Sequence, residues 1–249
     1  MSELPPLLME IHRGLPRQGP GDAASTTRAF AMLALKTDKP RILDVGCGPG
    51  AQTIDLARLS NGAITALDSG QTFLDELEAR IKGTQAQPRI RPVRGSMFDM
   101  PFEDSAFDLI WAEGAIYIIG FEKGLKTWRR FLAEGGAIAV SHISWLKRDT
   151  PDEPRQFWNA AYPAITTVED NLAILRAGGF EPAGHFVLPE AAWWADYYDP
   201  MQTRLAVLRG KYAGDQAALA VIAESQREID LYRSYSGCYG YVFYTARKL

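Results

Sequence analysis

Apolar positions along the chain follow two different periods. Short continuous apolar runs, each ending in a glycine or a polar residue, are typical of buried parallel strands. They cover residues 42–45, 63–67, 107–112 and 137–143. Between and around them, apolar residues recur at helical spacing over 51–59, 71–82, 121–132, 169–177 and 215–235. Strand and helix in alternation predict an α/β fold with a parallel sheet and right-handed crossovers.

The remaining strand patterns are less uniform. Residues 89–94 alternate and contain Pro92, which favours an edge strand because proline cannot donate to a ladder. Residues 180–188 form a further predicted strand, and residues 236–246 form a last one rich in Tyr, Val and Phe.

Residues 1–38 precede the first core strand and are treated as an N-terminal extension. Asp22 or Ser25 can cap a helix that runs to about Lys36. The extension can lie over the strand ends as a lid, or it can be a simple packing helix. Both interpretations stay open.

Composition restricts the function classes. The chain has 249 residues, 47% apolar and 23% charged, with a net charge of -3 and no basic block, which argues against a nucleic-acid partner. No apolar run reaches the length of a membrane span, and the first residues lack the features of a secretory signal, so we expect a cytoplasmic protein without a membrane partner. Two cysteines and three scattered histidines predict neither a disulfide framework nor a metal site.

The candidate ligand-binding residues begin with a glycine turn directly after the first strand. Gly46, Gly48 and Gly50 follow that strand, and a helix begins at Ala51. Ligands of such folds bind at the carboxyl ends of strands, where glycine lets the backbone approach them closely. Asp68 ends the next apolar run, where an acid can hold ribose hydroxyls. This pattern also fits the dinucleotide fingerprint of an NAD-dependent dehydrogenase.

The string Asp-Val-Gly-Cys-Gly-Pro-Gly at 44–50 separates the two interpretations. With Asp68 after it, this string resembles the first motif of the class I S-adenosyl-L-methionine-dependent methyltransferases. Met100-Pro101-Phe102 and Phe107-Asp108-Leu109-Ile110 resemble that family's next loop and fourth strand. From about Gln18 to the end, the chain is similar to the small-molecule branch.

This resemblance implies a single domain over 1–249 with a Rossmann-like, seven-stranded, mostly parallel sheet. Helices cover both faces and the last strand is antiparallel. It also implies S-adenosyl-L-methionine as cofactor and a small-molecule methyl acceptor. Residues 147–168 and 189–214 are expected as insertions near the acceptor. Their aromatic side chains can wall a pocket, pack in the core or form a homodimer contact: Trp158, Tyr162, Trp193, Trp194, Tyr197 and Tyr198.

The resemblance also implies roles for the cofactor-binding residues. Asp44 is expected to accept hydrogen bonds from the turn amides or the cofactor ammonium, and Asp68 to accept both ribose hydroxyls. Gln52 is expected to reach the cofactor carboxylate. Because Asp68 is a turn acid, we expect Asp68→Ala to weaken cofactor binding with little change in the stability of the free protein. The full predicted set is Asp44, Gly46, Cys47, Gly48, Gly50, Gln52, Asp68, Ser69, Ser96, Met97 and Glu113.

One family feature is absent at the third strand. Relatives often carry an acid after a glycine there, which reads the adenine amino group. In this chain Ser96 follows Gly95, so Ser96, the Met97 backbone or Asp99 would substitute.

Methyl transfer needs a base only when the acceptor is protonated. Glu113, Tyr117 and His142 are candidates at strand ends, although His142 is as readily a core histidine and Tyr117 a packing residue. The acceptor can be an amine, a phenol, a sterol-like or a quinone-like molecule. A non-catalytic cofactor-binding protein remains an alternative, because no catalytic dyad is evident.

Overall fold

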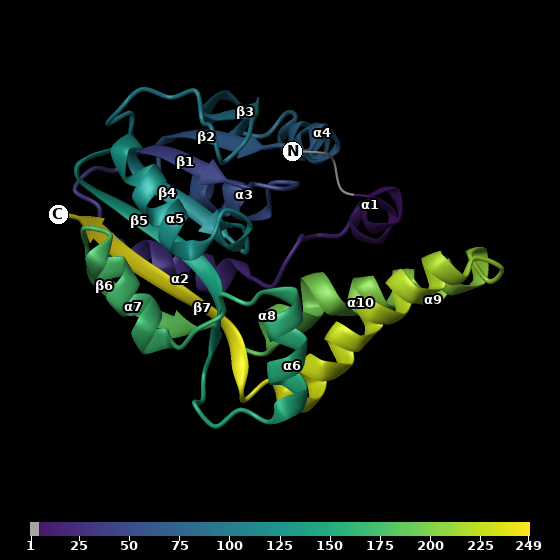
Figure 1. The fold of residues 1–249 in the computed structure, drawn as a ribbon. Coiled ribbons are helices and arrows are strands. Elements are labelled where there is room, and N and C mark those ends of the chain that lie inside the picture. Colours follow the sequence, from purple (N-terminus) through teal and green to yellow (C-terminus); the bar gives the residue numbers. More distant parts are fainter. Residues whose placement is uncertain (1–4) are drawn as a thin grey trace.

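Seven strands form one sheet in the order β3-β2-β1-β4-β5-β7-β6 in the computed structural model, which describes residues 5–249 (Figure 1). Neighbours from β3 to β5 pair in parallel, whereas β7 is antiparallel to both β5 and β6. The predicted Rossmann-like sheet with an antiparallel last strand is therefore confirmed. The strands are β1 Arg41–Val45, β2 Ala63–Asp68, β3 Ile90–Arg94, β4 Phe107–Glu113, β5 Leu132–Trp145, β6 Phe180–Val187 and β7 Tyr239–Lys248.

Ten α-helices and several short turns connect the strands of the described residues. They are α1 Pro6–His12, α2 Ala23–Leu33, α3 Ala51–Leu59, α4 Gln71–Ile81, α5 Phe121–Trp128, α6 Asp152–Ala161, α7 Val168–Ala177, α8 Ala191–Trp193, α9 Asp199–Lys211 and α10 Gln216–Tyr235. The short turns are η1 Gln87–Arg89, η2 Ile116–Ile118, η3 Arg129–Phe131 and the π-helical η4 Trp194–Tyr198.

Alternate residues of the central strands pack on opposite faces of the sheet. Ile42 belongs to one buried cluster, together with side chains of α2, α3 and α4. Leu43 belongs to a second cluster, with side chains of α5 and α7. Because both faces of β1 are covered, its sequence is an apolar run rather than an alternating one.

The direction of strand succession reverses between β1 and β4, which are neighbours in the sheet. A crevice forms at the carboxyl ends of strands at such a switch point. Figure 1 shows α9 and α10 extending away from the sheet as a pair, with α1 between this pair and α4. The chain thereby brings N-terminal and C-terminal helices to the same edge of the sheet.

Several predicted boundaries were wrong. The helix expected over 121–132 ends at Trp128, because Leu132 already pairs with Phe107 as the start of β5. The helix after Asp22 ends at Leu33 because Ala34 adopts a left-handed conformation with φ of 43°. Helix α1 was not predicted at all.

The N-terminal cap of α2 is confirmed, since the Asp22 side chain accepts a hydrogen bond from the Ser25 amide at 2.6 Å. Of the predicted extension over 1–38, residues 1–4 lie outside the described residues. Within the two predicted insertions, α6 lies in 147–168, and α8, η4 and α9 lie in 189–214.

Candidate functional site

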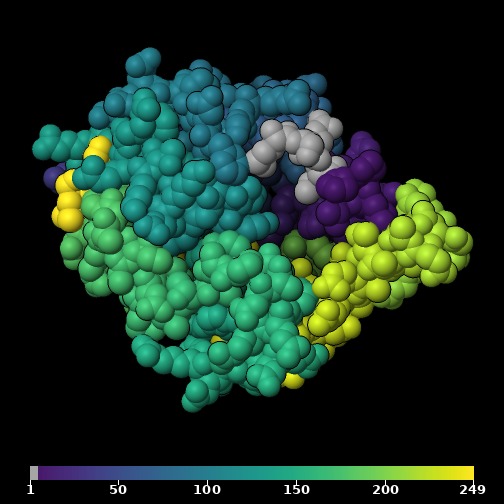
Figure 2. All heavy atoms as spheres, viewed as in Figure 1, coloured from purple at the N-terminus to yellow at the C-terminus, as the bar shows by residue number. Residues whose placement is uncertain are grey.

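A cavity of about 440 Å³ opens at the carboxyl ends of the parallel strands. Figure 2 shows the surface hollowed where the purple N-terminal segment meets the teal middle of the chain and the yellow-green C-terminal helices. Most of the predicted cofactor-binding residues line it: Gly46, Cys47, Gly48, Gln52, Asp68, Ser69, Ser96, Met97 and Glu113. Asp44 and Gly50 do not line it.

The glycine turn shapes the floor of the cavity. The amides of Gly46 and Cys47 both donate to the Leu67 carbonyl, at 2.8 and 3.0 Å. Gly46 has φ of 72°, and a Cβ there would lie 2.5 Å from the Ala115 Cβ. Only glycine therefore fits this position, and the backbone is exposed to the cavity where a side chain would fill it.

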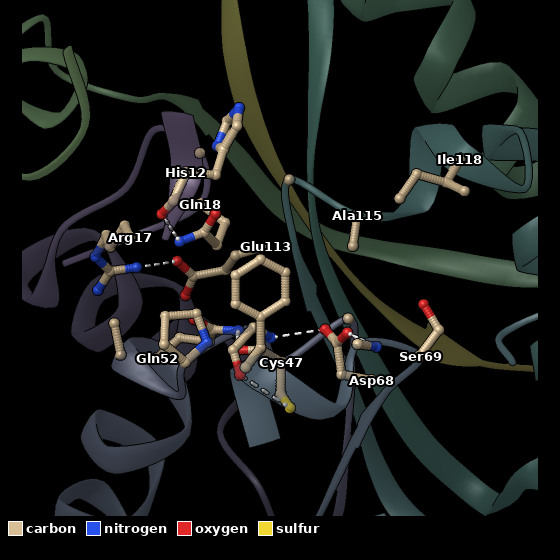
Figure 3. A pocket seen from close by; sticks show the side chains of 18 of the residues that line it. His12, Arg17, Gln18, Cys47, Gln52, Asp68, Ser69, Glu113, Ala115 and Ile118 are labelled. Carbon is tan, nitrogen blue, oxygen red and sulfur yellow. Dashed lines mark hydrogen bonds and ion pairs between the residues drawn. The ribbon is translucent and has the colours of Figure 1, made fainter. Parts of the chain in front are cut away.

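Asp68 holds the turn from the neighbouring strand. Its Oδ2 accepts the Gly48 amide at 2.9 Å, and its Oδ1 accepts the Gly70 amide at 2.8 Å (Figure 3). Burial raises the pKa of Asp68, and these backbone hydrogen bonds oppose that rise. An ionised carboxylate has about four acceptor positions. The Ser69 backbone also lowers the pKa of Asp68, so ligand hydroxyls share this carboxylate with the backbone around it.

Of the predicted partners of Asp44, the turn amides do not contact it, whereas the cofactor ammonium stays a prediction. The Asp44 carboxylate accepts the Thr53 hydroxyl at 2.5 Å and the Gln52 amide group at 3.3 Å, and no turn amide donates to it. It is fully buried, and burial raises its pKa to about 7. The first turn of α3 brings residues 52 and 53 over the end of β1, so each carboxylate oxygen of Asp44 has a side-chain donor.

Gly50 and Gln52 shape the junction between the glycine turn and α3. Gly50 is the N-cap of α3 with φ of 85°, and a Cβ there would meet Leu77 of α4. The Gln52 amide group donates to Asp44 and to the Cys47 carbonyl at 3.2 Å. Gln52 therefore orients the turn from inside, besides lining the cavity.

The third strand contributes Gly95, Ser96 and Met97 to the lining, whereas Asp99 does not reach the cavity. The Met97 carbonyl accepts the Trp128 indole N–H at 3.1 Å, which fixes this corner of the backbone. The Ser96 hydroxyl oxygen accepts a hydrogen bond from the Phe98 amide at 3.2 Å. Of the three residues expected to substitute for the missing acid, Ser96 and Met97 line the cavity and Asp99 does not.

Glu113 lies at the end of β4 with its carboxylate buried and paired. Arg17 donates to Oε2 at 2.8 Å, and the Thr26 hydroxyl and the Trp111 indole N–H donate to Oε1 at 2.7 and 2.9 Å. Arg17 also contacts Asp55 at 3.3 Å. This network attaches the N-terminal segment to β4, as Figure 3 shows for Arg17 and Glu113.

The other two catalytic candidates lie in different surroundings. Tyr117 lines the cavity, and 40% of its surface is exposed. His142 is 1% exposed and does not line the cavity. Its ring stacks on Phe121 at 4.7 Å, and neither nitrogen has a hydrogen-bond partner within residues 5–249. Burial lowers the pKa of His142 to about 3, so its imidazole is neutral.

Sequence reasoning missed several residues that line the cavity: His12, Arg17, Gln18 and Glu228. Gln18 lies directly over the turn, since a Cβ at Gly48 would come within 3.3 Å of its Cγ. Its amide group donates to the His12 carbonyl at 3.0 Å, while its Oε1 is buried with no partner in the described part of the chain. No local pattern identifies these residues, because they come from helices and loops at both ends of the chain.

Most insertion aromatics pack against other aromatic side chains, including ones on α10 and β7. Trp193 stacks on Tyr232 at 3.9 Å, and Trp158 meets Tyr239 at 5.2 Å edge-on. Tyr197 alone of the six predicted aromatics lines the cavity. Within residues 5–249, no helix is both long and apolar enough to cross a membrane.

Comparisons with known proteins bear on this site. Residues 42–136 match the sequence profile of a family described as "Methyltransferase domain". Sterol 24-C-methyltransferase erg-4 of Neurospora crassa is 27% identical over 181 residues, which are 69% of this chain and 45% of that protein. The chain thus matches less than half of the length of that relative.

Two further comparisons extend over most of the chain. The 27-O-demethylrifamycin SV methyltransferase of Amycolatopsis mediterranei is 26% identical over 235 residues, covering 90% of this chain and 82% of that protein. The crystal structure of a SAM-dependent methyltransferase from Geobacter sulfurreducens in complex with S-adenosyl-L-homocysteine superposes with a TM-score of 0.83. It shares 20% sequence identity and covers 100% of both chains, which supports the same fold.

Proposed function

The chain belongs to the class I S-adenosyl-L-methionine-dependent methyltransferases, and from that premise we propose that it transfers a methyl group to a small-molecule acceptor. One observation carries the proposal. At the switch point of the sheet, the Asp68 carboxylate and Gln18 line one cavity, whose floor is a glycine-rich turn. The Oε1 of Gln18 is buried with no hydrogen-bond partner among residues 5–249.

The residues present fit the cofactor. We assign its ribose hydroxyls to Asp68, whose carboxylate lines the cavity and can accept further hydrogen bonds. We assign its ammonium to Gln18 Oε1, a buried acceptor for which residues 5–249 supply no donor. Ser69, Ser96 and Met97 are the proposed adenine contacts, and the bound cofactor supplies an activated methyl group on a positive sulfur.

The chain's own task is to orient the acceptor and exclude water. An acceptor atom must be held about 3–3.5 Å from the methyl carbon, in line with the bond that breaks. The pairing of Arg17 with Glu113 supports the proposal that the N-terminal segment covers this region as a lid. The single domain, a cytoplasmic location and a homodimer remain predictions.

The fold gives the dehydrogenase alternative no support. That alternative requires a second mononucleotide-binding half, but β7 runs antiparallel between β5 and β6. The non-catalytic alternative predicts cofactor binding without methyl transfer.

Calorimetry tests the proposal with S-adenosyl-L-homocysteine and NAD as titrants. We expect binding of S-adenosyl-L-homocysteine and none of NAD, and release of S-adenosyl-L-homocysteine when a panel of small-molecule acceptors is supplied with S-adenosyl-L-methionine. Absence of binding at millimolar concentration contradicts the proposal. Binding without transfer to any acceptor favours the non-catalytic alternative.

A further inference from the structure

Besides the glycine turn and the strand ends, the cavity is lined by side chains from elements far apart in sequence. We call this part of the cavity the acceptor chamber, and it is lined by Leu8, Met9, His12, Tyr117, Tyr197 and Glu228. These residues come from α1, η2, η4 and α10. Apart from Glu228, they present apolar or aromatic groups.

Glu228 is the carboxylate of this chamber. Its Oε1 accepts the Tyr198 hydroxyl at 2.9 Å, whereas its Oε2 has no hydrogen-bond partner in the described part of the chain. No lysine or arginine of residues 5–249 pairs with it. Burial raises the pKa of Glu228, the Tyr198 hydrogen bond opposes the rise, and Glu224 adds to it. An unpaired carboxylate facing an aromatic cavity is costly for folding, which is typical of a functional group.

Among residues 5–249, no free cation lines the chamber to receive an anionic acceptor. Arg17, which lines the wider cavity, already contacts Asp55 at 3.3 Å and Glu113 at 2.8 Å. Burial lowers the pKa of His12, which favours its neutral form. A carboxylate or phosphate bound in this chamber would face Glu228 and find no free positive partner within residues 5–249.

The tyrosines add polar groups without charge. Tyr117 and Tyr197 line the chamber, and no protein group of the described residues hydrogen-bonds either hydroxyl. Each phenol can donate to and accept from an uncharged polar group of a ligand. Their rings, with Leu8 and Met9, suit an apolar body.

We propose that the acceptor chamber takes an uncharged molecule with a hydroxyl group on an apolar body, and that Glu228 receives the proton of that hydroxyl. In the transfer step the acceptor oxygen forms the bond to the methyl carbon, and the carbon–sulfur bond breaks with its electron pair left on sulfur. The hydroxyl proton moves to Glu228, so a positive sulfur and a carboxylate become a neutral thioether and a neutral acid. The proposal rests on the proposed methyltransferase function.

A matched probe series tests the charge preference by binding alone. With S-adenosyl-L-homocysteine bound, para-butylphenol, para-butylaniline and para-butylbenzoate present the same body with hydroxyl, amine and carboxylate heads. We expect para-butylphenol to bind at least tenfold more tightly than para-butylbenzoate. In Glu228→Gln that ratio should fall at least fivefold, mainly because para-butylbenzoate gains affinity.

Glu224→Gln is the matched control. Glu224 lies one turn earlier on α10, and its side chain is 61% exposed and 3.7 Å from Arg227. The same loss of charge outside the cavity should leave the ratio within twofold of wild type. The proposed specificity is overturned if the ratio of the two affinities in Glu228→Gln equals that of wild type. It is also overturned if para-butylphenol at millimolar concentration does not bind, or binds more weakly than para-butylaniline.

A rate measurement tests the proton transfer. We expect wild type to release S-adenosyl-L-homocysteine from S-adenosyl-L-methionine and para-butylphenol, and Glu228→Gln to lose about a hundredfold or more of that rate, in the range of general-base catalysis. Tyr198→Phe should lose less, because it removes one positioning hydrogen bond. S-adenosyl-L-homocysteine affinity should remain near wild type in both variants, and Glu228→Gln should unfold at the wild-type temperature or above it, because it removes a carboxylate that is costly for folding. If neither wild type nor the variants bind S-adenosyl-L-homocysteine, the result contradicts the methyltransferase proposal and not the role of Glu228.

Two outcomes overturn the role of Glu228. One is a rate in Glu228→Gln equal to that of wild type, and the other is no methyl transfer to the bound phenol in wild type.

Discussion

At the scale of single residues, Asp68 has two tasks that compete for one carboxylate. It accepts the Gly48 and Gly70 amides in the free protein and, by the proposal above, the ribose hydroxyls of the cofactor. The expectation that Asp68→Ala leaves the free protein unchanged is therefore revised, since two amides would lose their acceptor.

We predict that Asp68→Ala raises the dissociation constant for S-adenosyl-L-homocysteine at least tenfold and also lowers the free energy of unfolding by about 1–3 kcal/mol for each amide left unpaired. Calorimetry and urea unfolding measure the two effects. Asp75→Asn, an exposed change on α4, is the control that should alter neither. Wild-type affinity in Asp68→Ala would show that the ribose lies elsewhere.

Asp44 gives a pH prediction with a defined sign. Its pKa is about 7 in the folded protein against an ordinary value of 3.8, so the folded state holds a proton that the unfolded state has lost between about pH 4 and 7. This contribution to stability is present below about pH 4 and declines as the pH rises to about 7.

Asp44→Asn removes that contribution and can still accept the Thr53 hydroxyl. We expect the stability of the variant relative to wild type to increase from pH 4 to pH 7, by up to a few kcal/mol. Urea unfolding of both proteins at several pH values measures the difference. Parallel stability curves for the two proteins would contradict the raised pKa.

At the scale of elements, the junction of the turn with α3 depends on Gly50. Its φ is 85°, and a Cβ there would lie 2.2 Å from Leu77 Cδ1 of α4. Gly83 has a similar φ of 73° but no atom within 4 Å of its hypothetical Cβ. The two glycines therefore separate backbone strain from a packing clash.

We predict that Gly83→Ala costs about 1–2 kcal/mol of unfolding free energy, the cost of a left-handed residue that carries a Cβ. Gly50→Ala should cost this amount and at least 1 kcal/mol more, because α4 must move to admit the methyl group. Urea unfolding of both variants provides the comparison. Equal losses of unfolding free energy in the two variants would mean that α4 moves to admit the methyl group at no energetic cost.

At the scale of the whole molecule, one buried ion pair connects the N-terminal segment to the centre of the sheet. Arg17 lies between Asp55 of α3 and Glu113 of β4, and both side chains of the Arg17–Glu113 pair are less than 10% exposed. Removing one partner of a buried pair leaves an uncompensated charge, whereas removing both is often tolerated.

Arg17→Ala should therefore lose about 3–5 kcal/mol of stability and expose residues 5–22 to proteolysis. The double variant Arg17→Met with Glu113→Gln should recover most of the stability, since glutamine still accepts from Thr26 and Trp111. Arg13→Ala, an exposed change in the same segment, is the control for loss of an arginine. Unchanged proteolysis in Arg17→Ala would show that other contacts hold the segment.

The sequence by itself determined the parts of this protein that depend on neighbouring residues. The apolar run of β1, the left-handed glycines after it and the helix from Ala51 form one local unit, and side-chain period gave the parallel strands of the sheet. Asp68 could be placed beside the turn because β1 and β2 are adjacent parallel strands whose carboxyl ends coincide.

Only the tertiary structure decided which groups meet in the cavity. Arg17 and Glu113 are separated by 96 positions, and Gln18 and Glu228 come from opposite ends of the chain. Such contacts depend on how helices pack on the sheet. The spacing of apolar residues within one helix or strand does not predict that packing. The same reason explains the aromatic insertions, which mostly fill the core while Tyr197 reaches the cavity.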